Sequence, residues 1–72
     1  MDEKERIKTL VKWEKDDIEW NKRLICVLEK HKRNASNKGW VSATRLINDI
    51  IETTNKSILK SKMRIRQILK GE

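Results

Sequence analysis

Apolar residues recur at the spacing of an α-helix along most of the chain, and they predict four helical stretches. These stretches cover residues 3–15, 17–32, 43–52 and 56–70. Proline is absent and glycine is rare, which also favours an all-helical chain. The residues that carry the pattern are Ile7, Leu10, Val11 and Trp13, then Ile18, Trp20, Leu24, Ile25, Val27 and Leu28, then Ala43, Leu46, Ile47, Ile50 and Ile51, and last Ile58, Ile65, Ile68 and Leu69.

Polar clusters between these stretches predict the helix boundaries. Asp2 and Asp16 are the candidate N-caps of the first and second helices. The sequence NASNKG at residues 34–39 has the composition of a loop, and a very short extended segment near Trp40 leads to the third helix. A tight turn at residues 53–54 precedes the last helix. The predicted fold class is therefore all-α, a small three- to four-helix bundle.

The junction between the first two stretches has two interpretations. A break or bend near Asp16 and Asp17 is favoured, because the acids from Glu14 to Glu19 suit a helix cap better than a metal or acid-base site. A continuous helix over residues 3–32 is the alternative. Its heptad seam would consist of Ile7, Leu10, Glu14, Asp17, Asn21, Leu24 and Leu28. Three consecutive polar residues in that seam argue against an extended coiled coil.

Length and composition limit the class of protein further. Seventy-two residues form one domain at most, with a small core in which Trp20 and Trp40 are expected, since tryptophan is the only aromatic residue type present. Cys26, the only cysteine, is expected to be a small buried apolar residue. No paired catalytic groups or metal-ligand spacings occur, so we expect no enzyme, metal or cofactor. No membrane span or signal peptide is evident, which predicts a soluble, cytoplasmic protein.

The formal charge of +7 is uneven along the chain, and it points to a polyanionic partner. Residues 53–70 carry six lysines and arginines and no acid. Opposite the isoleucines of the last predicted helix lie Lys56, Lys60, Arg64 and Gln67, with Lys62 and Arg66 on a flank. A row of long donor side chains of this kind suits a DNA major groove, where such residues read base edges and flanking cations bind phosphates.

Residues 18–70 resemble the helix-turn-helix superfamily in its tri-helical or winged-helix form. The resemblance rests on a long first helix, the bridging GWVS, a short second helix with Leu46, Ile50 and Ile51 inward, the turn at residues 53–54 and the basic last helix. It implies a DNA-binding domain at residues 17–72, preceded by an N-terminal helix at residues 1–16. A winged-helix domain would continue into a hairpin here, so the wing is absent, the N-terminal helix compensates for it, or the sequence is a fragment.

The sequence thus predicts a DNA-binding protein, sequence-specific or architectural, in transcription regulation or replication control. The base-reading residues are Lys60, Arg64 and Gln67, and the phosphate-binding residues are Lys56, Ser57, Lys62, Arg66, Arg45 and Lys38. The candidate homodimer surface consists of Ile7, Leu10, Val11 and Trp13. Neither a membrane nor a small-molecule substrate is expected as a partner. The alternatives are a module whose basic helix docks an acidic protein, and a protein that binds RNA or single strands.

Overall fold

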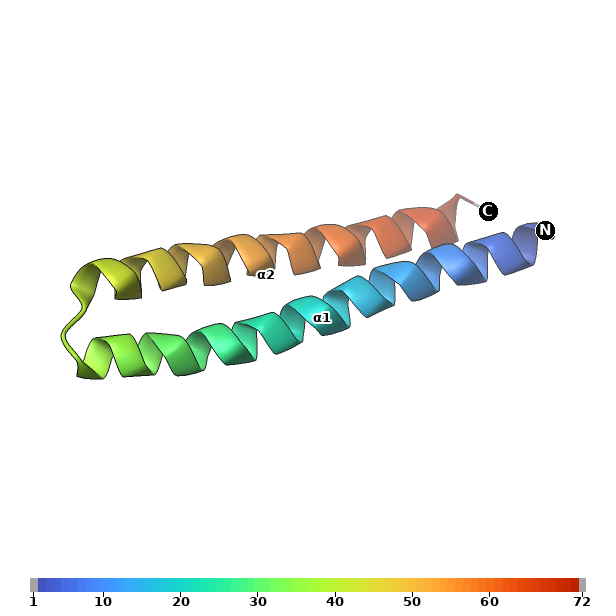
Figure 1. Ribbon diagram of the computed structural model, residues 1–72. Coiled ribbons are helices and arrows are strands. Elements are labelled where there is room, and N and C mark those ends of the chain that lie inside the picture. The colour runs from blue at the N-terminus through green and yellow to red at the C-terminus, as the bar shows by residue number, and fades with distance from the viewer. Residues whose placement is uncertain (1, 72) are drawn as a thin grey trace.

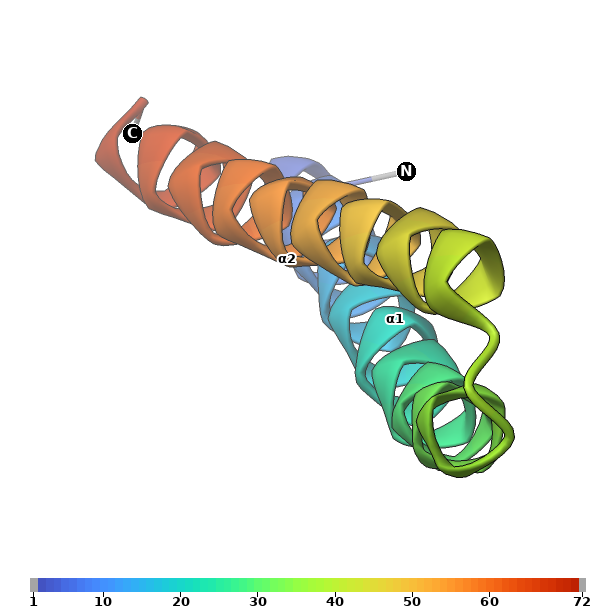
Figure 2. The same cartoon turned by 90° about the vertical axis from the view of Figure 1, so that its left-hand side faces the viewer.

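Two long α-helices joined by a short loop make up residues 2–71, the part of the chain that the computed structural model describes. α1 covers Glu3–Asn37 and α2 covers Val41–Lys70. The helices run antiparallel, with both ends of the chain at one end of the hairpin and the loop at the other (Figure 1). Seen from the loop end, they cross at an angle (Figure 2). The hairpin is long and narrow, with principal extents of 55 × 15 × 11 Å.

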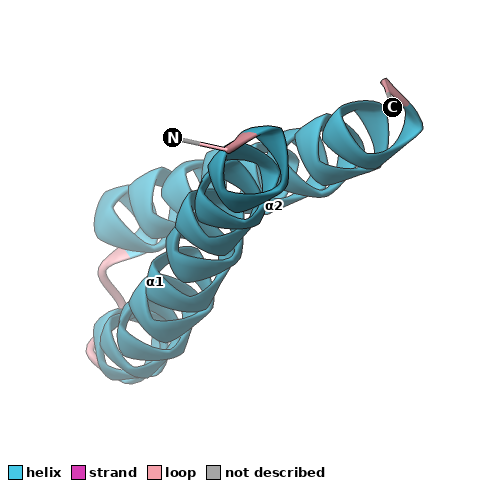
Figure 3. Ribbon diagram, turned by 90° about the vertical axis from the view of Figure 1, so that its right-hand side faces the viewer, coloured by secondary structure: helices cyan, strands magenta, loops and turns pink. Residues whose placement is uncertain are grey.

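The prediction of an all-helical chain is confirmed, because residues 2–71 contain helices, a loop and no strand (Figure 3). The prediction of a three- to four-helix bundle is not confirmed, since two helices account for these residues. The very short extended segment predicted near Trp40 is not confirmed, since Trp40 lies in the loop between the helices and no strand forms there. A helix-turn-helix core is also not confirmed, because its second and third helices are parts of one continuous α2.

Residues at alternating spacings of three and four are buried or half-buried along both helices, and they form the contact between α1 and α2. On α1 they are Ile7, Val11, Glu14, Ile18, Asn21, Ile25, Leu28, Lys32 and Ala35. On α2 they are Thr44, Ile47, Ile51, Thr54, Ile58, Ser61, Ile65 and Ile68. Together these residues form the inter-helix seam. Three of the four apolar residues predicted for the core side of the last helix belong to it, whereas Leu69 is exposed.

The predicted break near Asp16 and Asp17 is wrong, since α1 passes through both residues without interruption. Aspartate inside a helix costs only a few tenths of a kcal/mol, at most about 0.7, relative to alanine. A continuous α1 keeps Ile18 and Ile25 in the seam, and their burial outweighs that cost. The alternative of one long helix is therefore correct. Its seam, however, contains Val11, Ile18 and Ile25 in place of the predicted Leu10, Asp17 and Leu24.

The predicted turn at residues 53–54 is also absent, because both threonines lie inside α2. Their hydroxyl groups donate to the carbonyls four residues earlier, Thr53 to Asp49 at 3.0 Å and Thr54 to Ile50 at 2.7 Å. A side chain that bonds its own helix in this way no longer competes with the helical backbone. Two threonines that resemble a turn in the sequence are thus compatible with a continuous helix.

Small residues of α2 allow the two helices to approach each other closely. Thr54 and Ser61 are 7% and 2% exposed, and both lie in the seam. The ion pair between Glu14 and Arg64 fixes how the helices are aligned, and this alignment sets Ser61 level with Ile18 and Thr54 level with Ile25. A large side chain therefore faces a small one in these layers, as close packing requires.

The loop is shorter than predicted, because α1 continues through Ala35, a buried seam residue, to Asn37. The helix then ends in a Schellman motif. In that motif the N–H of Gly39 donates to the Ser36 carbonyl at 3.0 Å, and the N–H of Trp40 donates to the Ala35 carbonyl at 2.9 Å. At the other end of α1, the predicted N-cap is confirmed, since the Asp2 carboxylate accepts from the backbone N–H of Lys4.

We expect Gly39→Ala to lower the free energy of unfolding by about 1 kcal/mol or more, because Gly39 has a φ of 73° and a Cβ is unfavourable in that left-handed region. No atom lies within 4 Å of the added Cβ, so the loss would come from the backbone conformation alone. Urea unfolding followed by circular dichroism measures the change. Gly71→Ala, at a φ of −68°, is the matched control, and an equal loss in both variants would contradict the explanation.

Candidate functional site

A row of cations follows the inter-helix seam along one flank of the hairpin. Lys8, Lys12 and Lys15 each come directly after a seam residue of α1, and Lys62 and Arg66 come directly after seam residues of α2. In an antiparallel pair, the residues that follow the seam on the two helices lie on the same flank. The five side chains are all exposed, and together they form the basic face.

A shallow groove with an apolar floor runs between the helices on this face. The residues that line it are Ile7, Lys8, Val11, Lys12, Lys15 and Leu69. The aliphatic stem of a lysine can cover such a floor while its ammonium group stays in water. From Lys8 to Lys15 the row extends along the helix by about 10 Å, at about 1.5 Å per residue. The basic face therefore presents its charges as a row with a defined direction.

None of the acids of the hairpin neutralises the basic face by an ion pair. The ion pairs formed within residues 2–71 are Glu52–Lys56 and Glu14–Arg64. From Lys8 to Lys15 on α1 and from Lys62 to Leu69 on α2, every residue that directly follows the seam is lysine, arginine or leucine. The face is therefore a patch of positive charge, and it ends at Glu19, which follows the seam residue Ile18 on the same flank one turn after Lys15.

The structure distributes the nine predicted DNA contacts over several surfaces. Lys62 and Arg66 belong to the basic face, and Arg45 lies on the same flank nearer the loop. Lys56 lies on the outer side of α2, with its Nζ 3.8 Å from a carboxylate oxygen of Glu52. Lys38 lies in the loop, and its ammonium group is 4.7 Å from the centre of the Trp40 ring. Three of these five contacts thus share one flank.

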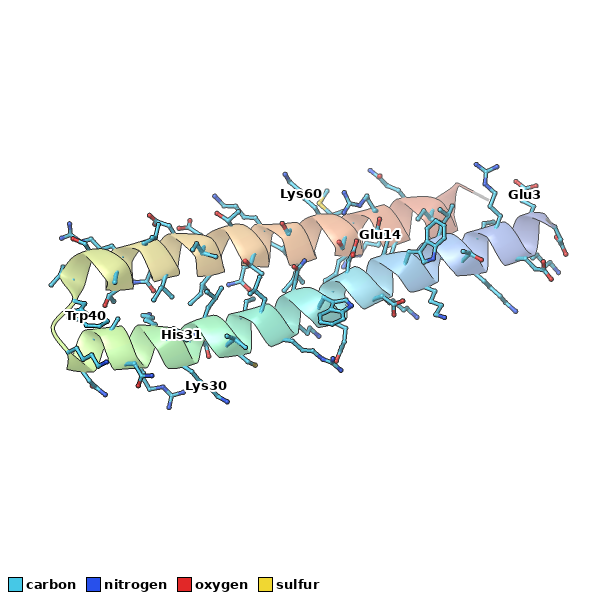
Figure 4. All side chains as sticks on the ribbon, in the orientation of Figure 1. Glu3, Glu14, Lys30, His31, Trp40 and Lys60 are labelled. Carbon is cyan, nitrogen blue, oxygen red and sulfur yellow. The ribbon has the colours of Figure 1, made fainter. Side chains whose placement is uncertain are left out.

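The other four predicted contacts lie on the opposite flank. Ser57, Lys60, Arg64 and Gln67 each come directly before a seam residue of α2. Ser57 is half-buried, whereas Lys60 projects away from α1 (Figure 4). The predicted base-reading residues therefore share one flank, but they face away from Lys62 and Arg66, which were expected to bind phosphates beside them.

Arg64 is held by a partner within the hairpin. Its Nε lies 2.9 Å from Oε1 of Glu14, and its Nη2 donates to Oγ of Ser61 at 3.2 Å. The Glu14 side chain lies between the helices and is 18% exposed, compared with 53% for Arg64 (Figure 4). Oε2 of Glu14 has no hydrogen-bond partner. The interpretation of Glu14 as one of a group of capping acids is therefore wrong, since it is a seam residue that binds Arg64.

The flank opposite the basic face is rich in exposed apolar side chains. It consists of the residues that come directly before seam residues, and we refer to it as the tryptophan face. Its members on α1 are Arg6, Leu10, Trp13, Asp17, Trp20, Leu24, Val27, His31 and Asn34, and its members on α2 are Ala43, Leu46, Ile50, Thr53, Ser57, Lys60, Arg64 and Gln67. Trp13 and Trp20 are 62% and 68% exposed.

Several residues expected in the core lie instead on the surface. Trp20 and Trp40 are both exposed, and so is Cys26. Of the residues predicted to form a dimer surface, Ile7 and Val11 belong to the inter-helix seam, whereas Leu10 and Trp13 belong to the tryptophan face. Two helices that pack along a single seam leave little interior, and this interior is filled by aliphatic and small polar residues.

The lysines of α1 are the functional candidates that sequence reasoning missed. Lys8, Lys12 and Lys15 lie far from residues 53–70 in the sequence, and acids are interspersed with them in the first half of the chain. Their spacing of four and three residues, each directly after a seam position, was the available signal. That signal becomes visible only when the seam is assigned correctly.

Other kinds of site find less support among the residues that the structure describes. No group of three or more His, Cys, Asp or Glu side chains within residues 2–71 could hold a metal ion. Despite their length, neither α1 nor α2 contains a stretch apolar enough to cross a membrane. Comparison of the chain with protein-family models, curated proteins and solved structures found no significant match.

Proposed function

We propose that the protein binds double-stranded DNA through the phosphate backbone, with the basic face as the contact surface. The observation that carries this proposal is the row formed by Lys8, Lys12, Lys15, Lys62 and Arg66, which comes from both helices and has no acid within it. Long flexible cations without bidentate base-reading partners bind phosphates in any sequence. An architectural role in transcription or replication control fits this mode of binding.

The absence of aromatic rings from the basic face favours a duplex over a single strand. Proteins that bind single strands combine a basic groove with aromatic side chains on which the bases stack. Trp13 and Trp20 lie on the opposite flank, where the Arg23 guanidinium lies 5.5 Å from the Trp20 ring centre, so a strand bound along the basic face would have no ring of that face to stack on.

The test is a pair of charge-reversal variants with the same change in net charge. We expect Lys12→Glu with Lys15→Glu to weaken binding to a mixed-sequence duplex at least about tenfold at low salt, because two phosphate contacts are lost and two repulsions are added. Fluorescence anisotropy over a salt series measures the affinity and its salt dependence. Five phosphate contacts give a log–log slope near −4.5, and the variant should have a slope near −2.7.

Lys30→Glu with Lys56→Glu is the matched control. Both lysines are exposed and lie outside the basic face, and Lys30 points away from α2 (Figure 4). This control should bind the duplex with close to wild-type affinity and slope. Equal weakening in the two variants would show that binding depends on the net charge of the protein and not on the basic face. Failure of the wild-type protein to bind duplex at roughly 50 mM salt would refute the proposal and favour an acidic protein partner.

A further inference from the structure

α1 carries two parallel seams of apolar residues, of which the hairpin uses one. Each member of the tryptophan face directly precedes a member of the inter-helix seam, as Leu10 precedes Val11 and Leu24 precedes Ile25. Neighbouring residues of an α-helix are about 100° apart around its axis, so the two seams are separated by that angle. In a four-helix bundle every helix packs against two neighbouring helices. Around the axis of that helix, the directions to the two neighbours are about a right angle apart. The second seam therefore has the geometry of a contact with another helix.

The hairpin alone leaves this second seam exposed to water. Trp13 and Trp20 are each more than three-fifths exposed, and Leu46 on α2 is 62% exposed. Only Ala35 and Ile58 are fully buried apolar residues within residues 2–71. A chain of this length with so small a core usually needs a staple or a partner, and a contiguous apolar patch on a soluble protein usually marks an interface.

The tryptophan face is complementary to a second copy of itself. A two-fold axis parallel to the helices brings α1 of one copy against α2 of the other, with every residue level with the same position as inside the hairpin. With the alignment of the hairpin seam, in which Ile18 is level with Ser61, this arrangement brings Trp20 within one turn of Ser57 of the partner subunit and Asp17 within one turn of Lys60 of the partner subunit. A large ring thus meets a small side chain, and the acid of this seam meets a cation.

The remaining levels of this contact are also compatible. Val27 lies within one turn of the partner's Ile50, and Trp13 lies within one turn of the partner's Arg64, a combination that permits a cation–π contact. A two-fold axis perpendicular to the helices would instead set the basic half of α2 against its apolar half. That arrangement would bury cations against aliphatic side chains, which is unfavourable.

We propose that two copies of the chain pack through their tryptophan faces into a four-helix bundle whose loops lie at the same end. This interface keeps Leu10 and Trp13 of the dimer surface expected from the sequence and replaces the other two residues. The basic faces point outward on opposite sides of the bundle, so dimerisation and DNA binding use different surfaces.

Solution mass across a dilution series tests the proposal. The wild-type protein should have twice the chain mass of 8.6 kDa and dissociate on dilution. Trp20→Ala should raise the dissociation constant at least about tenfold, because a central aromatic anchor is lost. Trp40→Ala removes another exposed ring, 57% exposed against 68% for Trp20, from the loop outside the tryptophan face, and should leave the constant unchanged. A monomeric wild type, a larger closed assembly, or equal effects of the two variants would overturn the proposal.

A charge swap tests which helices meet and does not depend on Trp20. Asp17→Lys alone and Lys60→Asp alone should each weaken the dimer, because each places like charges within one turn of each other across the interface. The double variant should regain most of the wild-type affinity, since it restores an opposite pair. Full additivity of the two single effects would exclude this alignment. Circular dichroism of each variant establishes that the helices remain formed.

Discussion

Ile58→Ala should lower the free energy of unfolding by about 2–5 kcal/mol, the range for truncation of a buried aliphatic side chain. Ile58 is 7% exposed and lies in the middle of the α2 seam, where the hairpin cannot close around the space left by the truncation. Folded chains are stable by about 0.05–0.15 kcal/mol per residue, or about 4–11 kcal/mol for a chain of this length. The loss would therefore remove a large part of the total.

Urea unfolding at a fixed protein concentration measures this loss, because association would make the midpoint depend on concentration. Leu59→Ala is the matched control. Leu59 is the next residue along α2, is 60% exposed, and lies on neither the seam nor the tryptophan face. It should cost less than about 1 kcal/mol, as is usual for exposed positions. If the two truncations cost the same, the assignment of the seam is wrong.

The isoleucine side of α2 could be read from the sequence because it is nearly uninterrupted. Ile51, Ile58 and Ile65 recur every seven residues, and no competing apolar stripe accompanies them in the second half of the helix. The core positions of the last predicted helix were therefore correct except for Leu69. The helix cap at Asp2 was predicted for a similar reason, since it depends on local spacing alone.

The seam of α1 was harder to assign because two apolar stripes overlap there. The tryptophan face and the inter-helix seam are offset by one residue, so Leu24 and Ile25 appear equally suitable for a core. Choosing Leu10, Asp17 and Leu24 introduces an acid into the middle of the seam and makes a break attractive. The residues that follow them are Val11, Ile18 and Ile25, and with these the helix needs no break. The arrangement of α2 decides between the stripes, and no local pattern contains that information.

Only part of the candidate site was predicted from the sequence, and the reason is again that the packing of the two helices was not known. Residues 53–70 attract attention because they contain no acid, and two of their cations, Lys62 and Arg66, do belong to the basic face. The hairpin then adds lysines from the opposite end of the sequence, where nearby acids mask them. It also sets Lys60 and Arg64 on the other flank. Charge counted along the chain therefore differs from charge counted over the folded surface.

Arg64→Ala should lower the free energy of unfolding by about 1–3 kcal/mol, less than the 3–5 kcal/mol for a fully buried pair because the Arg64 side chain is about half exposed. The substitution would leave the Glu14 carboxylate between the helices with no cation, and one of its oxygens already has no hydrogen-bond partner. Arg66→Ala is the control. Arg66 is exposed and belongs to neither ion pair of residues 2–71, so its truncation should change stability by less than about 0.5 kcal/mol.

A double-mutant cycle separates the ion pair from any other role of Arg64. If the loss in Arg64→Ala comes from the stranded carboxylate, then Glu14→Leu in the same chain should recover most of it, since an apolar residue suits a seam position between Val11 and Ile18. A base-reading role for Arg64 makes the opposite prediction, because Arg64→Ala would then weaken DNA binding by about 1–3 kcal/mol while leaving stability unchanged. Urea unfolding and anisotropy on the same four proteins distinguish the two roles. Independent, additive losses would contradict the structural role, since the stranded charge arises only when Glu14 is present and Arg64 is absent.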